Sequence, residues 1–499
     1  MTIIETAQRA AIREHQRSGK GHQVIQALSG TGKSSVGRDL IYDLPGGKVA
    51  KMYAHNKSIA KHNGELVEGR ATSQTFHAAG RQMCVDAFGK HRPSYVNVEK
   101  YQIIFYKLLV KAGMNASEIW KWKNALVKVC EGVRQGLLEA TPENCESIAN
   151  RTGACFPYPH WSAIADLVND AMHKGAEDAE NWIDITDMLW IPFIRDLHPA
   201  VTCDYLYADE MQDGAPGHVD VLQRLSQNAI VTVLGDTKQA IYQFLGGDGK
   251  AIAALAKHYN SAIFPLSVCF RCPTSVIGLA QKYVPELEAA PGAEMGDVRE
   301  LERGRLYEEG RYGEGDMVIC RTRAPLIETY YQLIRHKVPC TISGKDIGDD
   351  LSALALSISK RFRFTFDRFG RFLTEYKDSK TKRMRDANVS DMEIESLLDR
   401  CASLNAIYEA AVDDDDGPVE IKGFRDFIEK NFSDEKLEHG VTLTTIHKSK
   451  GLEADNVYLL RPDLCPHKRA VTEEEMQAEY NCLYISYTRA KQTLTFLRG

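Results

Sequence analysis

The stretch that decides the fold is Ile25-Gln26-Ala27-Leu28-Ser29-Gly30-Thr31-Gly32-Lys33-Ser34, an apolar, strand-like run that opens into a loop of small residues. Gly30 and Gly32 allow the backbone to turn tightly and to point its N–H groups inward, as a phosphate-binding loop requires. In such a loop Lys33 reaches the β- and γ-phosphates, and the Ser34 hydroxyl is a ligand of Mg²⁺. A helix expected from about Ser34 directs its positive end at the same anion. The predicted loop contacts are Ser29, Gly30, Thr31, Gly32, Lys33, Ser34 and Ser35.

The strict loop pattern has glycine where this chain has Ala27, so the interpretation needs a second motif. Tyr205–Asp213 supplies one, because an apolar strand there ends in the adjacent carboxylates Asp209 and Glu210. Doubly wound sheets bind their ligands at this end of the strands. Asp209 is placed to hold Mg²⁺ and Glu210 to take the proton from an attacking water. Simple capping of the strand is the alternative, which the pairing with Lys33 disfavours.

Length and composition limit the remaining possibilities. A chain of 499 residues is too long for one core, and 43% hydrophobic with 26% charged residues is typical of globular proteins. No apolar run approaches the roughly 18 residues that span a bilayer, and the N-terminal residues do not have the layout of a signal peptide. We therefore expect a cytoplasmic protein with no membrane partner, in a bacterium with its nucleoid or in a phage-infected cell. A monomer is a separate expectation.

Charge and cysteine content give weaker signals. The net charge of −6 argues against a protein that coats polyanions in general, but a basic groove on an acidic body remains compatible with nucleic acid. The twelve cysteines are scattered. Cys269-Phe270-Arg271-Cys272 is the one C-x-x-C, and without a second pair or nearby histidines it does not predict a metal site.

Several further segments combine polar or aromatic groups with strand ends. Gln8, in an expected N-terminal helix, has an amide that can both donate to and accept from an adenine edge. The segment Ala229–Phe244 reads as a third strand followed by a polar turn, in which Gln239 can sense the γ-phosphate. Flat rings beside cationic or amide groups suit single-stranded nucleic acid, with ordinary loops as the alternative. These candidates are Tyr53, His55, Asn56, Lys57, Phe76, His77, Tyr242 and Phe244.

Two long segments, 94–184 and 351–435, have helical periodicity and read as insertions. In the first, Trp120 and Trp122 alternate with lysines, and packing in a core is favoured over contact with nucleic acid. In the second, Lys360–Phe372 alternates cations with rings and the basic run continues to Arg385, so a nucleic-acid contact and a solvated basic helix face remain equally open. The acidic run Asp413–Asp416 reads as a solvated loop.

The order of these motifs resembles superfamily 1 helicases of the UvrD, PcrA and Rep type. Asp-Glu-x-Gln-Asp is followed by Gly-Asp-x-x-Gln-x-Ile-Tyr-x-Phe, and Leu266–Cys272 is similar to the motif with an adenine-stacking ring, Phe270, and a γ-phosphate arginine, Arg271. Val441–Glu453 resembles the motif that binds single-stranded DNA, here through Thr445 and His447, and the nucleotide sugar through Glu453. Glu479–Lys491 resembles the last motif, whose arginine is Arg489.

Two motifs, Asn56–Ala60 and His447–Glu453, are similar to the F-box DNA helicase branch, with which we expect only the motor to be shared. Two departures are visible. Leu245 stands where the family usually has arginine, which puts one DNA or coupling contact in doubt. Ala54 and His55 stand where relatives tend to have phenylalanine, which puts base stacking there in doubt.

The resemblance implies an α/β fold of two RecA-like P-loop domains, parallel sheets wrapped by helices, each with a mainly helical insertion. The expected boundaries are 1–93 and 185–265 for the first motor domain, 94–184 for its insertion, 266–350 and 436–499 for the second, and 351–435 for its reduced insertion. ATP is expected between the two motor domains.

The implied activity is an ATP- and Mg²⁺-dependent helicase that moves 3′-to-5′ on single-stranded DNA and meets duplex junctions, with replication or recombination proteins as possible partners. A translocase that strips bound proteins without unwinding duplex is the alternative. An ATPase that acts on protein or small-molecule cargo is disfavoured. No added nuclease site is expected.

Overall fold

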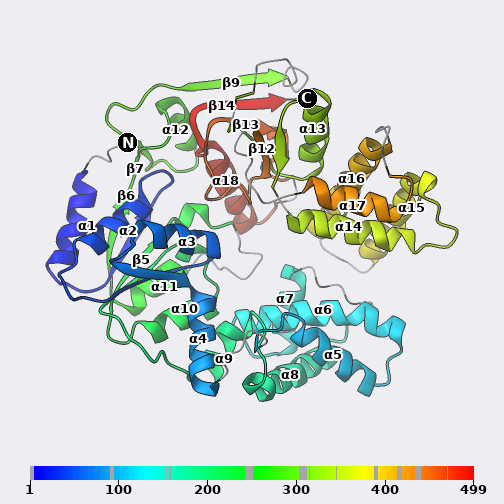
Figure 1. Cartoon of the computed structure of the whole chain (residues 1–499), viewed down its shortest axis with the longest axis horizontal. Helices are drawn as coiled ribbons and strands as arrows, with labels where there is room; N and C mark the ends of the chain where they lie inside the picture. Colours follow the sequence, from blue (N-terminus) through cyan, green and yellow to red (C-terminus); the bar gives the residue numbers. More distant parts are fainter. Residues whose placement is uncertain are drawn as a thin grey trace. The chain divides into compact units, whose positions relative to one another are not determined.

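The computed structural model describes residues 5–89, 95–152, 154, 156, 159–241, 251–302, 312–313, 315–343, 345–386, 391–412, 418–432, 440–468 and 470–498. The chain divides into two compact units, Met1–Ser267 and Val268–Gly499 (Figure 1). Each unit is built around its own parallel sheet wrapped by helices, as expected of RecA-like lobes. The predicted fold class is confirmed.

The first unit has a six-stranded sheet in the order β3-β2-β4-β5-β1-β6, with every neighbouring pair parallel. Its strands are β1 (Gln23–Ala27), β2 (Ala50–Ala54), β3 (Ala71–Thr75), β4 (Tyr205–Ala208), β5 (Ile230–Gly235) and β6 (Ala262–Leu266). Because β5 lies between β4 and β1, the loops that follow these three strands emerge side by side at one edge.

The helices of the first unit fall into two groups. Those that cover the sheet are α1 (Ala7–Arg17), α2 (Lys33–Tyr42), α3 (Lys57–Leu66), α4 (Phe76–Phe88), α9 (Asp187–Ile194), α10 (Pro216–Leu225) and α11 (Ala251–His258). The others, α5 (Lys100–Lys111), α6 (Ala116–Gln135), α7 (Pro142–Thr152) and α8 (Trp161–Glu177), form a separate helical core drawn from blue through cyan to blue-green in Figure 1. Trp122 packs against this core, with its ring centroid 5.4 Å from that of Phe156.

One strand is shorter than its sequence suggests. The apolar and polar pattern predicts a strand over 71–78, but β3 ends at Thr75 and α4 begins at Phe76. The Thr75 hydroxyl accepts a hydrogen bond from the Ala78 N–H at 3.1 Å and so caps the helix. Phe76 and His77 therefore belong to the first turn of a helix rather than to a strand end.

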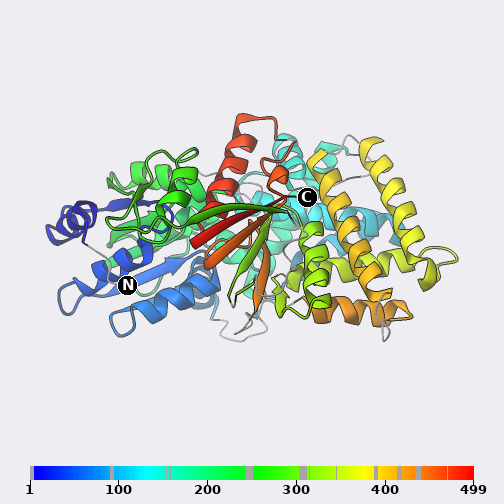
Figure 2. The same ribbon diagram turned by 90° about the horizontal axis from the view of Figure 1, so that it is seen from above.

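The second unit has a six-stranded sheet in the order β11-β12-β10-β13-β14-β9, again parallel throughout. Figure 2 shows these strands fanning out with the twist usual for a parallel sheet. They are β9 (Asp297–Glu302), β10 (Met317–Cys320), β11 (Cys340–Ile342), β12 (Val441–Thr445), β13 (Ala454–Leu460) and β14 (Ala490–Arg498), beside a separate pair, β7 (Val268–Cys269) and β8 (Glu288–Ala289).

The helices of the second unit again separate into a sheet layer and a helical layer. Those next to the sheet are α12 (Thr274–Ala280), α13 (Ala324–Arg335) and α18 (Glu473–Tyr487). The helical layer consists of α14 (Lys345–Ser359), α15 (Phe369–Asp386), α16 (Asp391–Val412) and α17 (Ile421–Asn431). No helix among the described residues of the chain combines the length and apolar composition needed to cross a membrane.

The basic, aromatic stretch 360–372 is divided between core and surface. Phe364, Phe366, Phe369 and Phe372 pack in or against the core of the helical layer, whereas Phe362 is 85% exposed. Lys380, Lys382, Arg383 and Arg385 are exposed on α15. Most of the rings are therefore occupied by packing, which favours a solvated basic helix face over a groove in which bases stack on these rings.

Candidate nucleotide site

The loop after β1 has the backbone of a phosphate cradle. Gly30 and Gly32 have φ values of 71° and 81°, a left-handed conformation that other residues adopt only with strain. The Thr31 hydroxyl donates to the Leu28 carbonyl at 2.7 Å and fixes the turn. Gly32 is the N-cap of α2, which begins at Lys33, so the N–H groups of the first turn lie at the end of the cradle.

Lys33 lies against the two carboxylates that follow β4. Its Nζ is 3.1 Å from Asp209 Oδ1 and also pairs with Glu210 Oε1. Burial would lower the pKa of Lys33, but the negative charges of Asp209 and Glu210 outweigh it and raise that pKa. The structure thus brings together three residues predicted from two separate motifs, and the parallel order β4-β5-β1 is what places them side by side.

In the loop after β4, Glu210 has an unusual backbone conformation. Glu210 has φ 58° and ψ 34°, in the left-handed region, where a residue with a β-carbon is strained. Its N–H donates to Asp209 Oδ1 at 3.0 Å, and its Oε2 accepts from Gln212 Nε2. Asn63 Nδ2 donates to Asp209 Oδ2 at 3.1 Å. Both carboxylates are therefore oriented by neighbours besides Lys33.

Gln212 extends this arrangement to the loop after β5. Its Oε1 accepts the N–H of Asp236 at 3.0 Å, and Asp236 Oδ2 accepts from Gln239 Nε2 at 2.7 Å. A β-carbon on Gly235 would lie 2.5 Å from Gln212 Oε1, so the close approach needs glycine there. Gln239, the predicted γ-phosphate sensor, is thus connected to Glu210 through two side chains, Gln212 and Asp236.

Gln8 is held at the opposite side of the cradle. Its Nε2 donates to Ser267 Oγ at 2.8 Å, and its Oε1 accepts the Ser267 N–H at 3.0 Å. Leu28 N–H donates to the Leu266 carbonyl at 3.0 Å, which ties the cradle to the end of β6. The amide predicted to recognise an adenine edge is therefore fixed in orientation by the strand that borders the loop.

The predicted nucleotide residues of the second unit lie close to one another within that unit. Arg271 Nε is 2.6 Å from Glu453 Oε2, and Arg271 Nη1 donates to the Thr488 carbonyl at 3.3 Å. Lys491 Nζ is 3.7 Å from Glu453 Oε1. Glu453, predicted to hold the nucleotide sugar, is in this structure the partner of Arg271. Phe270 is partly exposed next to it.

Arg489 is more deeply placed than an exposed catalytic arginine. Its side chain is 2% exposed, with Nη1 donating to the Leu452 carbonyl at 3.0 Å and Nε to the Ile485 carbonyl at 3.2 Å. Burial and the nearby charge of Arg271 lower the pKa of Arg489 to about 10, so it remains a cation at neutral pH.

Two of the predicted DNA-contacting rings are parts of the core. Tyr53 is 1% exposed and Phe76 is 0% exposed, and the two stack with centroids 5.7 Å apart. Because their faces are covered by neighbouring side chains, they support the sheet edge rather than present a surface to a base. This corrects the expectation that they stack on nucleic acid.

The other predicted groups at that edge surround His218, which the sequence did not single out. The ring of His218 lies 4.6 Å from that of His55 and 5.1 Å from that of His77, and its Nδ1 accepts the Ala215 N–H at 3.2 Å. Burial lowers the pKa of His77 to about 4 and that of His218 well below its ordinary value, with the neighbouring histidines adding to both shifts. His77 and His218 are thus neutral at physiological pH.

The remaining DNA candidates vary in exposure. Asn56 and Lys57 are exposed at the start of α3, where Asn56 Oδ1 accepts the Ile59 N–H at 2.9 Å as a helix cap. Thr445 ends β12 and its Oγ1 accepts the Lys448 N–H at 3.3 Å. Burial, with Arg321 nearby, lowers the pKa of His447 to about 3. Tyr242, Phe244, Leu245 and the acidic run 413–416 lie outside the described residues.

The donor set fits a nucleotide with its divalent cation. Ser34 and Asp209 offer the hydroxyl and carboxylate oxygens that Mg²⁺ prefers. No group of three or more His, Cys, Asp or Glu side chains among the described residues is arranged to hold a metal alone. Mg²⁺ usually completes its coordination with water and substrate phosphates, so a sparse protein donor set agrees with a site for Mg²⁺ and a triphosphate.

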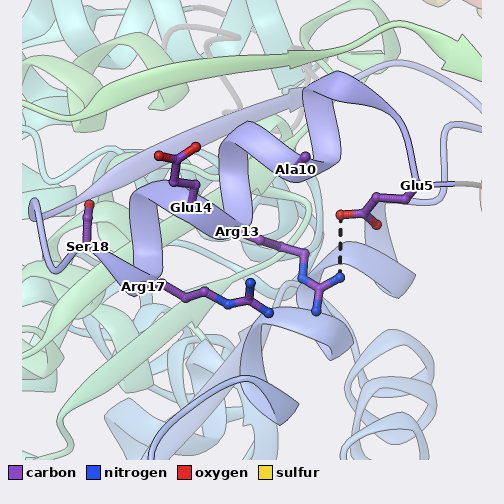
Figure 3. A pocket seen from close by; sticks show the side chains of 6 residues that line it. All are labelled: Glu5, Ala10, Arg13, Glu14, Arg17 and Ser18. Carbon is purple, nitrogen blue, oxygen red and sulfur yellow. Dashed lines mark hydrogen bonds and ion pairs between the residues drawn. The ribbon is translucent and has the colours of Figure 1, made fainter.

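A pocket on α1 lies apart from these residues. Figure 3 shows Glu5, Ala10, Arg13, Glu14, Arg17 and Ser18 around it, with Arg13 Nη1 3.4 Å from Glu5 Oε1. Arg13 also donates to Asp43 at 2.7 Å, and that hydrogen bond raises the pKa of Arg13. None of the predicted site residues lines this pocket, and it takes no part in the chemistry assigned to Lys33.

Sequence reasoning missed several residues that orient the predicted ones. Gln212 stood inside the quoted Asp-Glu-x-Gln-Asp motif, and its spacing from Glu210 was a usable signal. Ser267 stood inside the quoted Leu266–Cys272 motif, whereas Asn63 and His218 come from segments that nothing local marks. Their positions follow only from the order of strands in the sheet.

Comparison with known proteins connects this geometry to one family. The model of the UvrD-like helicase C-terminal domain matches residues 201–498, and that of the UvrD/REP helicase N-terminal domain matches residues 62–260. F-box DNA helicase protein 1 of Schizosaccharomyces pombe is 26% identical over 310 residues, which are 58% of this chain and 33% of that protein.

Two bacterial relatives match over shorter stretches. ATP-dependent DNA helicase Rep of Escherichia coli is 38% identical over 74 residues, 14% of this chain and 11% of Rep. ATP-dependent DNA helicase PcrA of Staphylococcus aureus is 44% identical over 62 residues, 11% of this chain and 8% of PcrA. The chain therefore aligns with a third or less of the length of each relative. Because the C-terminal family model covers more than half of the sequence, the chain belongs to the UvrD-like helicase family.

Proposed function

We propose that the protein is an ATP-dependent DNA helicase that moves 3′-to-5′ along single-stranded DNA. The observation that carries the proposal is the meeting of Lys33 with Asp209 and Glu210, from two distant motifs, at the carboxyl edge of a parallel sheet. Such an edge binds phosphate ligands in α/β folds, and the matching relatives are named as ATP-dependent DNA helicases.

The side chains divide the chemical work. Lys33 and the N–H groups of the cradle would hold the phosphates, Ser34 and Asp209 would hold Mg²⁺, and Mg²⁺ would neutralise phosphate charge. Glu210 would take the proton of the attacking water, and Gln239 would report on the γ-phosphate through Asp236 and Gln212. In this proposal Gln8 and Phe270 select adenine.

Two arginines of the second unit, Arg271 and Arg489, would act on the same triphosphate as Lys33. Their attraction to the γ-phosphate would depend on whether that phosphate is present, which is how nucleotide switches bias a two-state element. We retain the domain boundaries given from the sequence as part of this proposal. We expect single-stranded DNA to contact the edge that carries His55, Asn56, Lys57 and His77, together with Thr445 and His447.

The test is strand separation on matched 3′-tailed and 5′-tailed duplexes with ATP and Mg²⁺. We expect unwinding of the 3′-tailed substrate, DNA-stimulated ATP turnover, and a steep loss of DNA binding with added salt. Unwinding of the 5′-tailed duplex alone would show that movement has the opposite polarity. Loss of a bound protein from single strands without unwinding would show that the protein is a protein-displacing translocase rather than a helicase. ATP turnover that does not respond to DNA would refute the proposal.

A further inference from the structure

The pair Cys269 and Cys272 flanks two residues of the predicted nucleotide site, Phe270 and Arg271. Cys269 ends β7, and α12 begins at Thr274, two residues after Cys272. The Cys272 N–H donates to Cys269 Sγ at 3.4 Å, as in a C-x-x-C turn that brings the second cysteine back toward the first. The turn therefore holds the backbone of Cys272 against the sulfur of Cys269 while both thiols are reduced.

Cys269 differs chemically from the other described cysteines. The hydrogen bond from Cys272, with backbone N–H groups of Cys272 and Arg271, lowers the pKa of Cys269 to about 7 despite its burial. Burial raises the pKa of Cys84, Cys130 and Cys482 to about 12 and that of Cys145, Cys320 and Cys401 to about 11. The thiolate is the reactive form of cysteine, so Cys269 is the one expected to react first among them.

The second thiol touches the backbone beside Arg489. Cys272 Sγ donates to the Thr488 carbonyl at 3.5 Å, and Arg271 Nη1 donates to the same carbonyl at 3.3 Å. Thr488 directly precedes Arg489. A bond between the two sulfurs would remove the S–H donor from this carbonyl and close a ring around Phe270 and Arg271. The geometry of both predicted arginines would change with it.

We propose that Cys269 and Cys272 form a peroxide-sensitive disulfide that switches off ATP turnover. The thiolate of Cys269 attacks one oxygen of hydrogen peroxide, the O–O bond breaks, and hydroxide leaves, which gives a sulfenic acid. The thiol of Cys272 then attacks that sulfur, the S–S bond forms, and water leaves. The two sulfurs together lose two electrons and the peroxide gains them.

The burial of the pair selects the oxidant. Cys269 is 0% exposed and Cys272 is 3% exposed, so a small peroxide reaches them on a slight opening of the turn whereas a bulky disulfide such as oxidised glutathione is hindered. A thiol reductant reverses the bond. The structural part of this inference depends only on the two cysteines, and its effect on turnover rests on the proposed role of Arg271 and Arg489 at the triphosphate.

The experiment uses the full chain and trypsin. Free thiols are alkylated after peroxide treatment and the protein is digested without reductant. Trypsin cuts after Arg271, so Cys269 and Cys272 fall in separate peptides, 258–271 and 272–282. We expect these peptides to be joined after peroxide treatment, separated by dithiothreitol, and never joined in Cys269→Ser or Cys272→Ser. Unlinked peptides, or Cys269 oxidised only to sulfinic acid, would overturn the proposal.

ATP turnover is the second, independent measurement. Because misplacement of a catalytic group by about 1 Å can cost about 10²-fold, we expect a fall of that order in the peroxide-treated chain and recovery with dithiothreitol. Cys269→Ala and Cys272→Ala should resist the same treatment. An equal loss in these variants would overturn the switch. Joined peptides with unchanged turnover would refute the role of the arginines while keeping the disulfide site.

Discussion

Lys33 Nζ lies 3.1 Å from Asp209 Oδ1, so the lysine that should bind phosphate is paired with the carboxylate that should bind Mg²⁺. A nucleotide with its cation would replace this contact. Mg²⁺ would then balance the negative charge of Asp209, and the phosphates would balance the positive charge of Lys33. The ion pair thus holds a positive and a negative side chain next to each other, as a ligand with both a cation and phosphates requires.

We expect Lys33→Ala to abolish ATP turnover and to lower the free energy of unfolding at neutral pH. Without the ammonium group, Asp209 and Glu210 are left as adjacent partly buried negative charges. The double variant Lys33→Ala, Glu210→Gln removes one of these charges and should regain stability but not turnover. Urea unfolding and an ATPase assay measure the two effects. Unchanged stability of Lys33→Ala would contradict the electrostatic argument.

Glu210→Gln should bind ATP but lose turnover, because the amide cannot take a proton from water. The substitution keeps the shape of the side chain, so Lys33 retains its contact with Asp209. Nucleotide binding, followed with a fluorescent ATP analogue, should stay within a fewfold of the parent. Asp220→Asn on α10, where the carboxylate pairs with Arg224, is a matched loss of one charge and should leave turnover unchanged. Hydrolysis by Glu210→Gln at the parental rate would refute the assignment.

Arg489→Ala should lose turnover and also stability. The guanidinium donates to the carbonyls of Leu452 and Ile485 in a buried position, so it supports the fold as well as the site. Each buried carbonyl left without a donor lowers the free energy of unfolding by about 1–3 kcal/mol. Arg271→Ala, whose side chain is more exposed, should lose turnover with a smaller drop in the midpoint of thermal unfolding. Equal drops would contradict the structural role of Arg489.

A buried ionic cluster in the first unit gives a prediction about stability alone. Lys100 and Asp187 are both 0% exposed, with Lys100 Nζ 2.6 Å from Asp187 Oδ2, and Arg134 Nη1 lies 2.7 Å from Asp187 Oδ1. Asp187→Asn would leave two buried cations with one carboxylate, Asp184. Removing one member of such a cluster costs about 3–5 kcal/mol.

Urea unfolding of Asp187→Asn should therefore begin at markedly lower denaturant than in the parent. Asp178→Asn provides the control, because the Asp178 carboxylate makes a partly exposed contact of 3.8 Å with Lys174, and surface pairs contribute about 0–1 kcal/mol. The prediction fails if the two variants unfold alike. The cluster joins α5 and α6 to the start of α9, so its loss should loosen the helical insertion first.

The parts of this protein that sequence could predict are those set by local pattern and strand order. Apolar runs ending in Lys33, Asp209 and Asp236 predicted parallel strands, and the carboxyl ends of parallel strands lie at one edge, so the α/β class followed. The cluster of Lys100, Arg134 and Asp187 was not predictable, because its members are 87 and 53 residues apart and each looks like an ordinary surface charge. The individual site assignments stay predictions.

The sequence also could not show which aromatic rings are buried. Tyr53 and Phe76 follow a pattern shared by base-stacking aromatics and core aromatics, and only packing separates the two. Strand β3 ends at Thr75, earlier than the sequence pattern implied. The Thr75 hydroxyl caps α4 and so favours the start of the helix at Phe76. Where local chemistry competes with periodicity, the boundary is decided by the cap.

The histidines at the edge of the first sheet predict how stability depends on pH. Burial and the neighbouring His55 lower the pKa of His77 to about 4, whereas in the unfolded chain it is near 6.5. Between these values the unfolded state binds a proton that the folded state does not, so the free energy of unfolding rises with pH. Stability is therefore fully present above about pH 6.5 and is lost as the pH falls toward 4.

The measurement is urea unfolding at a series of pH values from 7.5 to 4.5 for the parent and His77→Asn. We expect the parent to lose stability on acidification, and the variant to lose less, since asparagine does not titrate in this range. His218 contributes in the same direction, because its pKa is lowered by burial and by both neighbouring histidines. A matched control is His173→Asn on α8, outside this cluster. An identical pH slope in His77→Asn and the parent would show that the cluster is not the source of the acid sensitivity.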